Sequence, residues 1–270
     1  MSDYDILLDD LSAEQDSVAD VLAGLPEDGW RTPTPATGWL VRDQVFHLWH
    51  YDDLAALSIT DPNAFIAVRD PAFADPTAYE RGHLQRAAEL TPTQLYDSWM
   101  AGQERVLQAL ASVDAHARIA WFGPPMSARS FATARLMETW AHGTDVREAL
   151  QLPPSASPRL RHVAHIGVIT RGWSFRLREL AVPPVEPRVE LTGPDGQIWA
   201  WGPEASPESV TGPALDFALL VTQRVHRDDT ALVATGEGAS HWLNVAQAFA
   251  GVPGPGRPPR SQRNRRSEHA

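Results

Sequence analysis

Apolar residues recur at every third or fourth position through most of the first 150 residues, and this spacing constrains the fold more than any other feature. Such a period is typical of amphipathic helices. It predicts helices over residues 3–25, 40–59, 76–90, 91–113 and 135–150, with residues 61–76 and 114–130 interpreted as loops. Thr91 and Pro92 suit the cap and first turn of their helix. Long helices in series favour an up-and-down bundle.

The pattern changes near residue 152. Short runs bounded by Gly, Pro and Asp predict strands at 188–193, 196–201 and 231–236, while helical spacing continues over 160–180, 212–226 and 240–251. The class is therefore α+β, with a helical bundle at 1–152 and a smaller α+β layer domain at 153–252. Residues 253–270 are expected to be a disordered, basic tail, because the last twenty residues carry five Arg and one Glu.

Composition narrows the chemistry and the partners. A net charge of −11 argues against a nucleic-acid partner, which needs clustered basic side chains. Apolar runs are too short to span a bilayer and the N-terminus is acidic, so we expect a cytoplasmic protein that acts on a small molecule and meets no membrane. The chain has neither Cys nor Lys, which excludes a thiol nucleophile or a Schiff base of its own. Nothing in the sequence constrains the oligomeric state.

Glu138 and His142 lie four residues apart, on one face of a predicted helix. Their simplest interpretation is an ion pair or a buried imidazole satisfied by a carboxylate. A second predicted helix carries His47 between Phe46 and Leu48. Together, His47, Glu138 and His142 would make a three-ligand site for a divalent metal, most readily Zn²⁺, with Ni²⁺ or Fe²⁺ as alternatives, and would leave positions open for water or substrate.

Other residues near these ligands are candidates for supporting roles. His50, one turn after His47, is a rival ligand or an orienting neighbour, and Asp53 and Asp145 are candidate orienting carboxylates. Trp49 and Trp140 are candidates to line an apolar cofactor or substrate pocket, as is Trp121.

Arg224 and Arg227, in the second half, could grip an anionic group of a ligand. The neighbouring Asp228 and Asp229 leave a simpler alternative open, in which both arginines form surface ion pairs.

The runs "TPATGWLVRDQVFHLWHYDDLA" and "ARLMETWAHGTDVREALQLP" resemble the DinB-like metal-binding bundles, and in particular the mycothiol-dependent maleylpyruvate isomerase family. In that family a Gly-Trp-x-Val-x-Asp entry opens a helix with one His ligand, and a later helix supplies Glu-x3-His with an Asp three residues on. The matching residues here are Gly38, Trp39, Val41, Asp43 and His47, then Glu138, His142 and Asp145. The second half is similar to the sterol-carrier-like accessory domain of these proteins.

The resemblance implies a metal ion that binds the thiol of mycothiol and presents a thiolate to a small electrophile. The enzyme would then be an isomerase or an S-transferase. An all-arginine composition is typical of a GC-rich actinobacterial source, where mycothiol is the abundant small thiol. Two alternatives stay open: a thiol-independent metal-dependent lyase, hydratase or cyclase of a biosynthetic pathway, and a non-catalytic small-ligand-binding protein.

Overall fold

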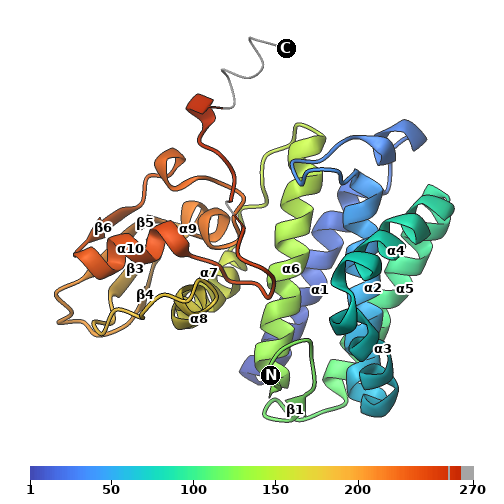
Figure 1. Cartoon of the computed structure of the whole chain (residues 1–270), viewed down its shortest axis with the longest axis horizontal. Coiled ribbons are helices and arrows are strands. Elements are labelled where there is room, and N and C mark those ends of the chain that lie inside the picture. The colour runs from blue at the N-terminus through green and yellow to red at the C-terminus, as the bar shows by residue number, and fades with distance from the viewer. Residues whose placement is uncertain (255, 263–270) are drawn as a thin grey trace. The chain divides into compact units, whose positions relative to one another are not determined.

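The computed structural model describes residues 1–254 and 256–262, and the rest of the predicted tail lies outside the described residues. The chain divides into two compact units, Met1–Ser155 and Ala156–Ala270 (Figure 1). Among the described residues, no helix is both long and apolar enough to cross a membrane.

Unit 1 is a helical bundle. Helix α2 packs on α5 and α6, and α1 packs on the same two helices, so the four enclose one core (Figure 1). Helices α3 and α4 pack on α2 and on each other. The elements are α1 (Asp3–Leu22), a 3-10 turn (Glu27–Arg31), α2 (Val41–Thr60), α3 (Pro62–Ala74), α4 (Pro76–Glu89), α5 (Pro92–Ala111), β1 (Arg118–Ile119), β2 (Met126–Ser127) and α6 (Ala128–Ala149). The core at one end of the bundle includes Leu48, Trp99 and Val146, each fully buried.

Side-chain caps fix where these helices begin. The Thr91 hydroxyl accepts from the Gln94 N–H, and Pro92 follows at the first helical position, as the sequence predicts. The Ser127 hydroxyl likewise accepts from the Ser130 N–H at the start of α6. At the start of α2, the Asp43 carboxylate accepts from the Leu40 N–H at 2.8 Å. This cap sets the phase of the helix that carries His47.

Unit 2 has a sheet of strand order β4-β3-β5-β6 within the described residues. Strand β3 pairs antiparallel with β4 and parallel with β5, and β5 pairs antiparallel with β6. Helix α9 packs on β3, β5 and α7, whereas α10 packs on β6 and α8. The elements are α7 (Leu160–Ile169), α8 (Arg171–Arg176), β3 (Arg188–Thr192), β4 (Ile198–Trp201), β5 (Ser209–Pro213), α9 (Ala214–Val221), a 3-10 turn (Arg227–Asp229), β6 (Val233–Thr235) and α10 (Glu237–Val245).

Two expectations from the sequence were wrong. Residues 61–76 are not a loop: they hold most of α3, whose first turn is capped by Asp61, and the start of α4, capped by Asp75. Strand β5 was not predicted, because its sequence "SVTGP" ends in Gly and Pro. It nevertheless pairs on both sides, so it is an inner strand of the sheet.

Helices α1 and α6 pack tightly at Gly143, next to His142. A Cβ atom on Gly143 would lie 2.5 Å from Cγ2 of Val18, a distance that side chains do not adopt. Val18 is itself buried and β-branched, so it has little freedom to move aside. The absence of a side chain at residue 143 therefore sets how near α6 lies to α1.

We predict that Gly143→Ala destabilises unit 1 by about 1–3 kcal/mol through overpacking. Urea unfolding followed by circular dichroism measures this. The matched control is Gly82→Ala in α4, where a Cβ meets nothing within 4 Å. Because alanine is the better helix former, the control should be neutral or stabilised by about 0.5–1 kcal/mol. In a Val18→Ala background the cost of Gly143→Ala should vanish. A cost that persists there would contradict the proposed clash.

Candidate metal centre

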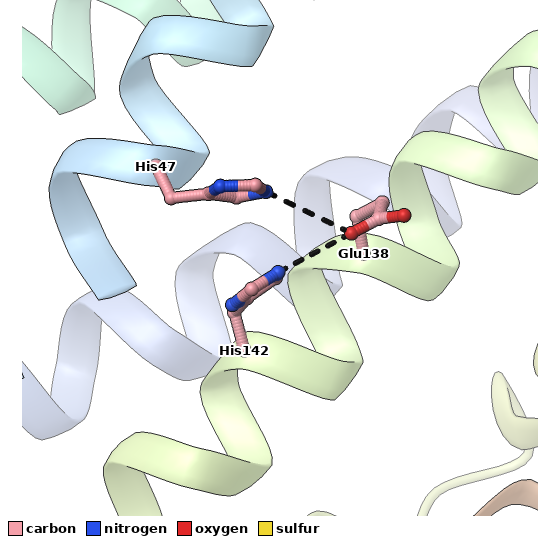
Figure 2. A group of neighbouring side chains, drawn as sticks. All are labelled: His47, Glu138 and His142. Carbon is pink, nitrogen blue, oxygen red and sulfur yellow. Dashed lines mark ion pairs between the residues drawn. The ribbon is translucent and has the colours of Figure 1, made fainter. Parts of the chain in front are cut away.

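Three side chains from two helices bring their ligand atoms together in unit 1. Oε2 of Glu138 lies 3.3 Å from Nε2 of His142 and 3.9 Å from Nε2 of His47, as Figure 2 shows. One ligand atom from each residue lies within 4.8 Å of the others. The side chains of His47, Glu138 and His142 are 20%, 22% and 12% exposed, so the group is shielded yet still accessible from solvent.

Local structure accounts for this convergence. Glu138 and His142 are one turn apart on α6, which places both side chains on the same face. His47 lies on α2, and α2 packs directly on α6. The chain enters α2 through Gly38, whose φ of +83° belongs to the left-handed region that favours glycine. The predicted Gly-Trp entry motif is thus a turn that needs its glycine.

The imidazole of His47 is held neutral. Burial lowers its pKa well below the usual range, and the neighbouring His142, His83 and Arg135 act in the same direction. Burial also lowers the pKa of His83 to about 3 and that of His50 to about 4. Neutral imidazole is the form that donates a lone pair to a metal ion, so His47 needs no deprotonation before it can act as a ligand.

Three polar pairs join α2 to α6, and we call them the polar ladder. They are Gln44 with His142, His47 with Glu138, and Asp52 with Arg135. Residue numbers rise along α2 as they fall along α6, as expected for antiparallel neighbours. In the third pair, Nε and Nη2 of Arg135 donate to Oδ1 of Asp52 at 3.1 and 2.9 Å. Burial raises the pKa of the Asp52 carboxyl, and the guanidinium opposes that effect.

Aromatic rings lie beside the proposed ligands. Trp39 stacks on His142 with ring centroids 6.1 Å apart, and Tyr51 contacts the His47 ring at 4.5 Å. Trp121 contacts Tyr51, so it lies one ring further out. Trp49 and Trp140 were predicted as pocket residues, but each is two positions from a ligand and therefore on the far side of its helix. Trp49 packs on Phe46, and the buried Trp140 donates to the Ser155 carbonyl.

His50, Asp53 and Asp145 were the other residues predicted to support the ligands. His50 is hydrogen-bonded through Nε2 to the Tyr79 hydroxyl at 2.5 Å. Asp53 accepts from Nη2 of Arg105, on α5, at 2.6 Å. Asp145 is buried on α6, one turn after His142.

The orienting contact that the sequence did not reveal is made by Gln44, whose Oε1 lies 2.5 Å from Nδ1 of His142. Gln44 is one turn before His47 and fully buried. No signal in the sequence singles out this amide, because its partner lies on another helix.

Arg224 and Arg227 belong to unit 2. Nη1 of Arg224 donates to the Thr222 carbonyl and Nη1 of Arg227 donates to the Ser240 carbonyl. Their role in binding an anion stays a prediction. Asp228, the predicted surface partner, lies 3.5 Å from Nδ1 of His226.

Comparison of the sequence with protein families and curated proteins gives the following matches. Residues 11–147, which include all three ligand candidates, match the family described as mycothiol maleylpyruvate isomerase N-terminal domain. Residues 183–235 match a second family, described as wyosine base formation. Two uncharacterised proteins of Mycobacterium tuberculosis, from strains CDC 1551 / Oshkosh and ATCC 25618 / H37Rv, are each 45% identical over 95% of this chain and 100% of their own length.

Two solved structures are similar to this chain in fold. The mycothiol-dependent maleylpyruvate isomerase aligns with a TM-score of 0.52 and 12% identity, and a histidine-to-alanine mutant of it with 0.53 and 13%. Each alignment covers 94% of this chain and 97% of the other. The likeness confirms the predicted fold class, a helical bundle followed by a smaller α+β part.

We predict that Arg135→Met lowers the free energy of unfolding by about 3–5 kcal/mol, because it leaves the fully buried Asp52 carboxylate without its cation. Urea unfolding at several pH values measures this. Burial raises the pKa of Asp52 in the folded state, so the folded protein binds the extra proton and the deficit should shrink as pH falls.

The control removes both charges. Asp52→Leu combined with Arg135→Met leaves no buried charge, and most of the lost stability should return. A double variant as unstable as Arg135→Met would contradict this account of the pair.

Proposed function

Because the chain belongs to the family of the mycothiol maleylpyruvate isomerase N-terminal domain, we propose that it is a metal-dependent enzyme that uses mycothiol and acts on a small electrophile as an isomerase or S-transferase. His47, Glu138 and His142 are the proposed ligands, and Zn²⁺ is the proposed metal. The observation that carries the proposal is the convergence of two imidazoles and one carboxylate from two packed helices inside the matched region.

The spacing of the donor atoms fits this role. Two ligand atoms on a tetrahedral ion at about 2.0–2.2 Å lie about 3.3–3.6 Å apart. The Glu138–His142 distance of 3.3 Å falls in that range, and the Glu138–His47 distance of 3.9 Å is slightly longer. Three protein ligands leave a position open for another molecule, as catalytic zinc sites do. Nitrogen and oxygen donors suit Ni²⁺ and Fe²⁺ as well.

The charge of the ligands suits a thiol cosubstrate. When bound, a divalent metal ion supplies a Lewis acid that stabilises the thiolate form of a thiol. His47 and His142 bind as neutral imidazoles, so Glu138 contributes the only negative charge among the three ligands. One positive charge of a divalent ion then remains to attract an anion. Since the chain has no Cys, the thiol must come from another molecule.

The surroundings favour an electrophile with a polar carbonyl and an apolar body. Trp39 and Tyr51 present ring surface beside the two imidazoles. Burial raises the pKa of Tyr51, so its hydroxyl keeps its proton at neutral pH and can donate a hydrogen bond to a carbonyl oxygen. Such a donor stabilises the negative charge that develops when a thiolate adds to an activated double bond.

We predict about one equivalent of metal per chain in protein purified without a His-tag, and at least about a tenfold loss in His47→Ala and in His142→Ala. Elemental analysis after incubation with Zn²⁺, Ni²⁺ or Fe²⁺ measures this. His116→Ala is the matched control, because His116 is an exposed imidazole of the same unit and is not one of the clustered ligands. Its metal content should equal that of wild type.

Activity separates the alternatives. The metal-loaded enzyme should consume activated cis double-bond substrates only when mycothiol is present. Turnover without any thiol would favour the lyase, hydratase or cyclase alternative. Absence of metal from wild type under all three conditions would overturn the proposal in favour of a ligand-binding protein.

A further inference from the structure

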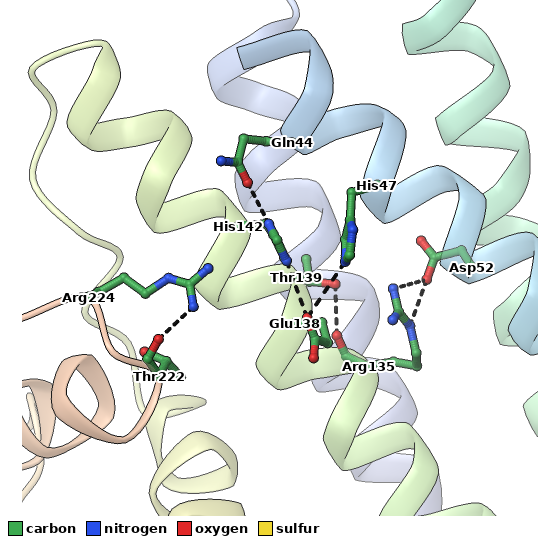
Figure 3. A network of polar contacts seen from close by, with 9 residues as sticks. All are labelled: Gln44, His47, Asp52, Arg135, Glu138, Thr139, His142, Thr222 and Arg224. Carbon is green, nitrogen blue, oxygen red and sulfur yellow. Dashed lines mark hydrogen bonds and ion pairs between the residues drawn. The ribbon is translucent and has the colours of Figure 1, made fainter. Parts of the chain in front are cut away.

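We infer that Gln44 is a positioning residue that holds the imidazole proton of His142 on Nδ1. In the neutral ring the lone pair of Nε2 then faces the space that His142 shares with Glu138 and His47, where an ion would bind (Figure 3). The purpose of this arrangement rests on the proposed metal-dependent function. The position of the proton does not, and it can be measured without any metal.

The backbone carbonyl oxygen of Trp39 carries no proton, so it can only accept hydrogen bonds. The carbonyl oxygen of Trp39 accepts from the Thr34 N–H at 2.8 Å and lies 3.0 Å from the Thr34 hydroxyl oxygen. A hydroxyl has a single hydrogen, and here it must point at the carbonyl. The lone pairs of the Thr34 hydroxyl are therefore left to accept, and their partner is the side-chain amide of Gln44 at 2.9 Å.

This contact fixes the orientation of the Gln44 amide. The atom that faces Thr34 must be the NH₂ nitrogen, so the atom that faces His142 is the amide oxygen. An amide oxygen only accepts, and Nδ1 of His142 must therefore carry the hydrogen. Gln44 is fully buried, which keeps water from replacing either contact. These hydrogen bonds therefore determine which nitrogen of His142 carries the proton.

Without Gln44, the imidazole proton of His142 would be more stable on Nε2 than on Nδ1. Oε2 of Glu138 lies 3.3 Å from Nε2 of His142 and is the stronger acceptor, because it belongs to a carboxylate. A proton on Nε2 would join these two atoms by a hydrogen bond and would block the lone pair that a metal ion needs. Gln44 provides an acceptor on the other side of the ring. It thereby favours the ligand form of His142 before an ion arrives.

The spacing of Gln44 and His47 in the sequence lets one helical turn serve two roles. Gln44 precedes His47 by three residues, so one turn of α2 supplies both a proposed ligand and the group that orients the other histidine. The Thr34 and Trp39 contacts come from the turn that leads into α2. The series of contacts from Trp39 through Thr34, Gln44 and His142 to Glu138 therefore depends on two short segments of the chain.

The first test reads the tautomer directly in metal-free protein. Long-range ¹H–¹⁵N correlation spectra at alkaline pH, where free imidazole is neutral, distinguish a proton on Nδ1 from one on Nε2. We expect Nδ1–H for His142 in wild type and Nε2–H in Gln44→Met, which keeps the volume but has no acceptor. Gln44→Glu restores an acceptor and should restore Nδ1–H. A proton on Nε2 in wild type, or on Nδ1 in Gln44→Met, would overturn the inference.

The second test measures zinc affinity by competition with a chelator. Gln44→Met should bind Zn²⁺ about 10–100-fold more weakly than wild type, and Gln44→Glu should recover most of the loss. The matched control is Gln15→Met in α1. Gln15 is also buried, and neither of its amide atoms has a hydrogen-bond partner among the described residues, so this change should leave zinc affinity and the His142 tautomer unaltered.

The two tests keep the inference separate from the proposed function. If wild type binds no zinc, the metal proposal fails while the spectra still decide the role of Gln44. An unchanged zinc affinity in Gln44→Met, in a protein that unfolds at the same urea concentration as Gln15→Met, would overturn that role.

Discussion

The register of α2 against α6 is the constraint on which the rest of unit 1 depends. The candidate centre takes one residue from α2 and two from α6, so a shift of either helix by one residue would turn its ligands away. The polar ladder opposes such a shift, because each rung pairs residues 83 to 98 positions apart in the sequence. Gly143 adds a steric condition, since it sets how near α6 lies to α1.

The same rungs have different energetic roles. The Asp52–Arg135 pair is almost completely buried, and in a pair of that kind the cost of desolvation offsets much of the attraction between the charges. The middle rung, His47 with Glu138, brings a desolvated imidazole close to a carboxylate. The Gln44 rung has no charge and acts on one proton. The interface between α2 and α6 thus contains both a buried ion pair with a structural role and two pairs with a proposed chemical role.

Much of this could be predicted from the sequence, because its signals were local. The long helices follow from a 3.6-residue period and from caps such as Thr91. Helix α3 was missed although Asp61–Pro62 and Asp75–Pro76 are both cap-and-proline starts, because the segment between them has little apolar periodicity. The three proposed ligands could be named because imidazole and carboxylate at helical spacing indicate a chemistry.

The rest depended on tertiary structure. Gln44 could not be singled out, since a buried amide gains its meaning only from a partner 98 residues away. The pocket role of Trp49 and Trp140 stays a prediction, and a rotation of 100° per residue turns both side chains away from His47 and His142. Asp53 was assigned by its proximity in sequence, whereas its actual partner, Arg105, comes from another helix.

The packing of α1 on α6 also sets an order of events during synthesis. Helix α1 is the first element of unit 1 and α6 the last, and these two helices contact each other directly. While the ribosome makes the first 127 residues, α1 lacks one of the two helices on which it packs, and His47 lacks both of its proposed partner ligands. Helix α6 carries Gly143, Glu138 and His142, so all three arrive with the last helix of the unit. The three candidate ligands therefore converge only when the bundle closes.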